Sequence, residues 1–115
     1  MSEAEFTQHV ASECIVREAA SLLKANYAKN GAFPDTNKQF AELVEMNRKQ
    51  FICGPYSKVI ENGQAIDSFG NPLQYIPGTE SVIVYTTSTS LHESEPFALK
   101  VTAKEIQEFR MGSGK

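Results

Sequence analysis

The two cysteines carry the most distinctive chemistry in this chain of 115 residues. Cys14 and Cys53 do not form a CxxC pair, and with the distant His9 and His92 they do not match a zinc-binding pattern. In an oxidising compartment they would form a disulfide closing a loop of about 40 residues, worth roughly 3–4 kcal/mol in the loop-entropy model. In the cytosol they would be two small buried thiols. The sequence leaves both states open.

Neither cysteine has the neighbours that a catalytic nucleophile needs. Arg17, one turn after Cys14, would favour a thiolate, but catalysis also needs a base and a group that orients it. His9 and His92 have no catalytic partner nearby in the sequence, and we expect both to be surface histidines. No phosphate-binding loop, dinucleotide fingerprint or GxSxG motif occurs. The sequence therefore predicts a protein that is not an enzyme and has no cofactor.

The polar segment 88–95 offers two carboxylates, Glu93 and Glu95, as candidate cation ligands or as an acid–base pair. The segment has neither an Asp-x-Asp spacing nor a glycine that would allow a tight ligand loop. We therefore expect a solvated surface loop here, and no metal site in the chain.

Composition excludes several classes of protein. Hydrophobic residues make up 41% of the chain and charged residues 22%, which is ordinary for a soluble globular protein. The net charge is −3 and the basic residues are scattered, so there is no electrostatic footprint for nucleic acid. No run of eighteen apolar residues and no signal-peptide pattern is present.

A long helix from about residue 4 to residue 30 must position most of the chain. Ser2 and Glu5 fit a capping box at its start, and Gly31 after Asn30 fits a left-handed helix end. Neither proline nor glycine interrupts the residues between these signals. The helix would be roughly 40 Å long, which is long for a domain of this size.

The two halves of this helix have different apolar faces. At the helical period, the second half buries Ala11, Ile15, Ala19, Leu22 and Leu23. The face opposite them carries Glu13, Arg17 and Lys24. The first half has a separate short stripe formed by Phe6, Val10 and Cys14. This change of face indicates either a helix that curves around one core, which is the simpler interpretation, or a first half that packs against something else.

The middle of the chain predicts a second helix and a small hairpin. Phe33 is expected to fold the connection back onto the core, and Pro34 keeps that residue extended. Thr36 and Gln39 fit a capping box for a helix over residues 37–47. Residues 51–53 are either a brief strand or a buried loop. The Asn-Gly pair at 62–63 favours a minimal hairpin.

The last third of the chain predicts strands over residues 73–76, 81–87 and 97–101. Thr102 and Glu105 then open a short C-terminal helix with Ile106 and Phe109 facing inward. The predicted fold is α+β: the long helix packs on an antiparallel sheet of about three strands, with short second and C-terminal helices. We expect a single domain over 1–115, with a helical spine (1–30), a helix–loop segment (31–66), a meander with the last helix (67–110) and a tail (111–115).

Two stretches of the chain resemble the type IV pilin-like superfamily. The first is the helix exit that contains Gly31, Phe33 and Pro34. The second resembles a stretch of the major pseudopilins of type II secretion and reads Asp67-Ser68-Phe69-Gly70-Asn71-Pro72-Leu73-Gln74-Tyr75. Gly70 would take a left-handed conformation, Asn71 would be extended before Pro72, and Asp67 would cap nearby amides. This turn would build the fold, with Phe69 and Tyr75 in the core.

The resemblance covers roughly residues 12 to 87 and implies a function. It implies a structural subunit, the head domain of a pseudopilin or pilin, that assembles with copies of itself and with related subunits through its N-terminal helix. In that family a cleaved leader and a hydrophobic membrane segment form the start of the helix, and neither is found within these residues. The resemblance thus implies an extracytoplasmic head, anchored to the membrane only through such a segment. The family's calcium-binding loop has no match in segment 88–95.

A different class of function is also open. The chain could be a free-standing cytosolic α+β module that binds a small ligand or a partner protein, with Cys14 and Cys53 reduced.

Overall fold

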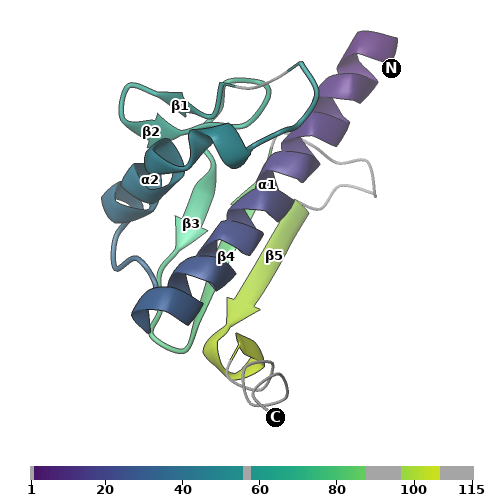
Figure 1. Cartoon of the computed structure of the whole chain (residues 1–115). Coiled ribbons are helices and arrows are strands. Elements are labelled where there is room, and N and C mark those ends of the chain that lie inside the picture. The colour runs from purple at the N-terminus through teal and green to yellow at the C-terminus, as the bar shows by residue number, and fades with distance from the viewer. Residues whose placement is uncertain (1, 56–57, 88–96, 107–115) are drawn as a thin grey trace.

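The computed structural model describes residues 2–55, 58–87 and 97–106 and shows an α+β fold (Figure 1). The elements, in chain order, are α1 (Glu3–Asn30), α2 (Asn37–Met46), the 3-10 helix η1 (Arg48–Gln50), β1 (Ile60–Glu61), β2 (Gln64–Ala65), β3 (Gln74–Ile76), β4 (Ser81–Thr86) and β5 (Phe97–Thr102). A C-terminal helix begins at Ala103 and is described as far as Ile106. Phe109 and the tail, like His92, Glu93 and Glu95, lie outside the described residues.

Helix α1 begins and ends where its capping residues predict. The Ser2 hydroxyl accepts the backbone N–H of Glu5 at 3.1 Å and donates to the Glu5 carboxylate at 3.2 Å. At the other end Gly31 has a φ of 75°, and its N–H donates to the carbonyl of Tyr27 at 2.7 Å. These bonds satisfy backbone groups that a helix end otherwise leaves unpaired.

The apolar face predicted for the second half of α1 is buried, with Val16 and Ala20 added to it. The prediction that Glu13 lies on the polar face is wrong, because Glu13 is only 6% exposed. Its neighbour on that face, Arg17, is exposed and lies 4.0 Å from the Glu13 carboxylate. A buried carboxylate needs compensating partners, so this position is constrained in a way that helical periodicity does not reveal.

Strands β3, β4 and β5 form an antiparallel sheet in that order. Its inner face presents Tyr75, Val82, Val84 and Val101, all buried. Two helices share this face. Helix α1 lies along β4 and β5, whereas α2 packs on β3 and on the β1–β2 hairpin (Figure 1).

Tyr75 connects the sheet to α2 and to the exit of α1. Its ring stacks on that of Phe40 with 4.5 Å between centroids, and its hydroxyl donates to the carbonyl of Pro34 at 2.7 Å. Burial, with a further contribution from Asp35, raises the pKa of the Tyr75 phenol above its ordinary value. Phe33, buried as expected, packs against Tyr27 with 4.5 Å between ring centroids. The connection after α1 is therefore fixed to the core.

The segments around α2 follow the sequence signals closely. Thr36 caps α2 by accepting the N–H of Gln39 at 3.1 Å. In the β1–β2 hairpin, Asn62 and Gly63 both have positive φ, 52° and 76°, which is typical of a type I′ turn. Residues 51–53, left open as a strand or a loop, form a loop after η1 with Phe51 and Cys53 buried.

Candidate functional site

Asp67 organises the turn that leads into β3. Its side chain is 1% exposed, and its Oδ1 accepts the N–H groups of Phe69 at 2.9 Å and Asn71 at 3.1 Å. Gly70 has a φ of 83°, and its N–H donates to the Asp67 carbonyl at 3.0 Å. Pro72 pairs with Ile66 in an isolated bridge. The stretch from Asp67 to Pro72 is thus a compact hydrogen-bonded turn.

One residue of this turn is not where the sequence predicts. Phe69 is half-buried and lies outside the core cluster, whereas Tyr75 lies within it. The Phe69 ring meets His9 of α1 edge-on, with 5.0 Å between centroids. His9 is accordingly half-buried rather than a free surface side chain, and its Nδ1 has no hydrogen-bond partner among the described residues. Phe69 faces α1 because the turn lies beside the helix and not beneath the sheet.

Two serines attach the same turn to α1. The Ser68 hydroxyl donates to the Gln8 carbonyl at 2.5 Å, and the Ser68 N–H donates to the Ser12 hydroxyl at 3.1 Å. The two hydroxyl oxygens are 2.6 Å apart, so the Ser12 hydroxyl is left to donate to Ser68. Sequence reasoning missed this contact, because small polar residues on a helix face give no pattern that predicts a partner 56 positions away.

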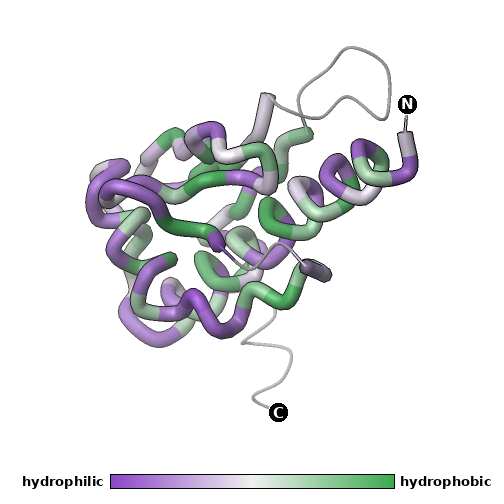
Figure 2. Tube along the Cα trace, turned by 90° about the horizontal axis from the view of Figure 1, so that it is seen from above, coloured by the Kyte–Doolittle hydropathy of each residue, from purple (hydrophilic) through white to green (hydrophobic). Residues whose placement is uncertain are grey.

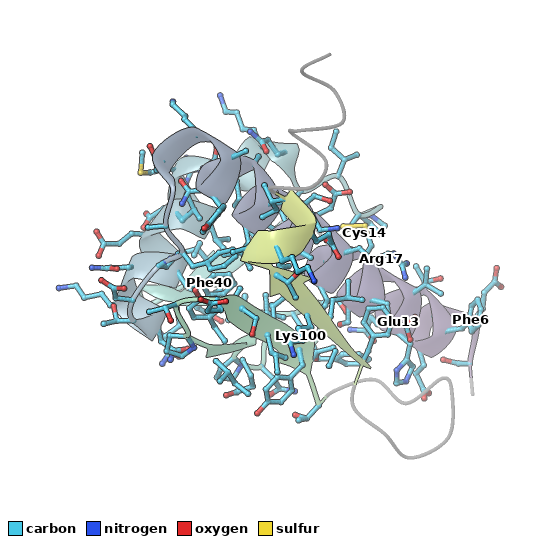
Figure 3. All side chains as sticks on the ribbon, turned by 90° about the horizontal axis from the view of Figure 1, so that it is seen from below. Phe6, Glu13, Cys14, Arg17, Phe40 and Lys100 are labelled. Atoms are coloured by element: carbon cyan, nitrogen blue, oxygen red, sulfur yellow. A yellow bond between two sulfur atoms is a disulfide. The ribbon has the colours of Figure 1, made fainter. Side chains whose placement is uncertain are left out.

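A disulfide joins Cys14 of α1 to Cys53, 39 positions later, with 5.8 Å between their Cα atoms. It fastens the loop after η1 to α1 (Figure 3). The turn and the disulfide thus hold α1 at two places, near Ser12 and at Cys14. The Gln8 carbonyl and the His9 ring also contact this turn, and before Gln8 the helix has no comparable attachment among the described residues.

The free end of α1 carries an exposed apolar stripe. Phe6 is 53% exposed and Val10 is 40% exposed. Figure 2 shows this end of α1 extending away from the rest of the fold, with hydrophobic and hydrophilic residues interspersed. Phe6 lies at its outer part, far from Phe40 and Lys100 (Figure 3). Cys14, the third residue of the predicted stripe, packs against the core, whereas the core leaves Phe6 and Val10 exposed.

Two charged side chains, Glu13 and Arg17, lie one to two turns after Val10 on α1. The guanidinium of Arg17 lies 4.0 Å from the carboxylate of Glu13 and 5.5 Å from the centre of the Phe97 ring of β5. A guanidinium over an aromatic face is attracted by the ring electrons. Figure 3 shows both charged side chains on the stretch of α1 that follows Phe6. The cluster links α1 to β5 and holds no nucleophile.

The described part of the chain presents no group of side chains suited to hold a metal ion. Within residues 2–55, 58–87 and 97–106, no three His, Cys, Asp or Glu side chains are grouped so as to hold a metal ion. Among the same residues no helix is apolar over enough length to cross a membrane. Exposed apolar side chains, among them Phe6 and Val10 on the helix that the disulfide fastens, are instead candidates for contact with another protein.

Comparison of the chain with protein-family models, with curated proteins and with solved structures finds no match.

Proposed function

We propose that this chain is a structural subunit, the head domain of a pseudopilin or pilin, which assembles into a filament of the type II secretion or type IV pilus kind. The observation that carries the proposal is the exposed stripe of Phe6 and Val10 on the projecting end of α1. Apolar side chains exposed on a helix that is otherwise well packed are suited to contacts with other helices. The partners are copies of the same chain and related subunits.

The anchoring of α1 supports this role. A subunit that transmits load through one helix needs that helix firmly joined to its head. The Ser68–Ser12 hydrogen bonds and the Cys14–Cys53 disulfide provide such joints directly after the projecting part. The core contacts of α1 with β4 and β5 continue the attachment to the C-terminal end of the helix.

The disulfide also bears on location. Disulfides persist in oxidising compartments and are rare in the cytosol. The Cys14–Cys53 bond therefore supports an extracytoplasmic head and weighs against the other candidate, a cytosolic binding module with reduced cysteines. In this proposal the protein is not an enzyme, has no cofactor, and meets a membrane only through a segment preceding the head.

Photo-crosslinking in the cells that naturally produce the protein tests assembly. Phe6→p-benzoylphenylalanine places a reactive group on the stripe, and Ile76→p-benzoylphenylalanine is the matched control, since Ile76 is 48% exposed on β3. We expect irradiation to give a ladder at multiples of the subunit mass from position 6 and little from position 76. A single unshifted band from position 6, in cells that contain the folded protein, would reject the proposal.

A further inference from the structure

A hollow with a basic rim lies beside the disulfide. Its walls are formed by Arg48, Lys49, Phe51, Ile52 and Gly54. Ile52 is 83% exposed there, and its backbone carbonyl oxygen lies 3.7 Å from the Cys14 sulfur. The disulfide therefore places an exposed apolar residue beside α1, and two cationic residues line the same hollow.

The projecting end of α1 has the complementary features. Phe6 is an exposed aromatic side chain, and Glu3 and Glu5 flank it in the first turn, both exposed. An aromatic side chain with acidic neighbours complements apolar residues with basic neighbours in hydrophobic character and in charge. Electrostatic complementarity of this kind fixes orientation and suppresses wrong partners.

Phe6, the anchor, cannot occupy the hollow of its own molecule. Phe6 and Cys14 are on one continuous helix, α1, and eight residues of helix separate them by roughly 12 Å along its axis. Because the helix is uninterrupted and Cys14 is bonded to the loop that forms the hollow, this separation is fixed. The occupant that fits must come from a second molecule.

We propose that Phe6 of one copy of this chain docks in the hollow at Ile52 of the next copy, with Glu3 and Glu5 facing Arg48 and Lys49. Two different surfaces meet in such a contact, so each copy still presents one free anchor and one free hollow. A contact of this type does not close on itself unless the rotation happens to form a ring, and it otherwise propagates into a filament. The inference rests on the proposed function and adds the partner surface for the exposed stripe.

The test maps the residues that Phe6 contacts and reverses the charges on both sides of the proposed contact. The chain with Phe6→p-benzoylphenylalanine is irradiated in its native cells, and the cross-linked peptides are identified by mass spectrometry. The same chain carrying Glu3→Lys and Glu5→Lys is then tested alone and together with a tagged copy carrying Arg48→Glu and Lys49→Glu. Control variants carry the same reversals on exposed side chains elsewhere, namely Glu42→Lys with Glu80→Lys, and Lys38→Glu with Lys104→Glu.

We expect cross-links from position 6 to the peptide spanning residues 48–54 of a second copy. Each charge reversal should lower their yield about tenfold, since two charge pairs become two repulsions. Mixing the two reversed chains should restore cross-linking between them, which a merely frayed helix end would not do. The control reversals should change the yield less than about twofold.

Other outcomes overturn the inference. The contact is rejected if the ladder persists but the cross-links map outside residues 48–54. It is also rejected if the charge reversals leave the cross-link yield unchanged. In both cases the proposal of filament assembly still holds. Cross-links to a different protein reject a second copy as the occupant. Loss of the ladder in the unreversed chain rejects the proposed function itself.

Discussion

The Oδ2 atom of Asp67 accepts the hydroxyl of Thr86 at 2.7 Å, and both side chains are buried. Its Oδ1 atom accepts two backbone N–H groups of the turn. One carboxylate thereby joins the turn before β3 to the end of β4, 19 positions away. Because the Asp67 side chain is almost completely buried and joins two elements, the carboxylate is a structural centre of the fold and not a surface charge.

Replacing Asp67 tests this role. Asp67→Ala would remove the acceptor of three hydrogen bonds, one of them from the buried Thr86 hydroxyl, so we expect it to lower the free energy of unfolding by about 3 kcal/mol or more. Asp67→Asn keeps an acceptor oxygen and should cost about half as much. Urea denaturation followed by circular dichroism measures both. Glu45→Ala, at an exposed position of α2, is the control. Equal stability of Asp67→Ala and this control would contradict the assigned role.

The disulfide should contribute to stability through the 39-position loop that it closes. The double variant Cys14→Ser with Cys53→Ser should lose about 3–4 kcal/mol in the loop-entropy model but should still fold, since most of the core is formed by other side chains. Thermal and urea unfolding of the two proteins check the loss. Mass spectrometry of the exported protein, before and after reduction and alkylation, checks the bond. Two free thiols in exported protein would remove this support for an extracytoplasmic head.

The contact of α1 with the sheet can be tested at Leu23, which is fully buried. Leu23→Asp should unfold the domain, because it places an unpaired charge in the core. Ser21→Asp, two residues earlier at an exposed position, should behave like the wild type. Circular dichroism distinguishes the outcomes. Wild-type melting of Leu23→Asp would mean that α1 does not pack on β4 and β5 as described.

Gly70 adopts a φ of 83° with open space around the position that a Cβ would occupy. The cost of a side chain here should therefore come from the backbone alone. Gly70→Val should lower the free energy of unfolding by about 1–3 kcal/mol, and Gly70→Asn by less, because asparagine tolerates the left-handed region better. Chemical denaturation of the two variants side by side shows which of them is less stable. If valine proved as stable as asparagine, the turn geometry would be wrong.

The buried phenol of Tyr75 makes stability depend on alkaline pH. Because its pKa is raised in the folded protein, the unfolded chain releases this proton first as pH rises. Its contribution to stability is complete below the ordinary tyrosine pKa of about 10 and is lost progressively above it. We expect the wild type to lose more stability than Tyr75→Phe between pH 9 and pH 10.5. Parallel slopes in urea denaturation across this range would contradict the burial of the phenol.

The sequence by itself determined the local architecture. Residues 2, 5 and 31 mark the ends of α1, Asn62 and Gly63 specify the hairpin, and the strands are found within one or two residues of their predicted bounds. These features depend on backbone preferences and on hydrogen bonds between near neighbours, which a single sequence states directly. The α+β class followed from them.

Only the tertiary structure decided how distant residues meet. It joined Cys14 to Cys53, fastened Ser68 to Ser12, buried Glu13, and turned Phe69 toward His9 instead of the core. It also set Ile52 beside α1 and left Phe6 exposed. These outcomes depend on the docking of elements far apart in the chain, where volume, shape and the pairing of polar groups decide the contacts. Periodicity identifies an apolar face, but the partner that covers it is fixed only when the elements pack together.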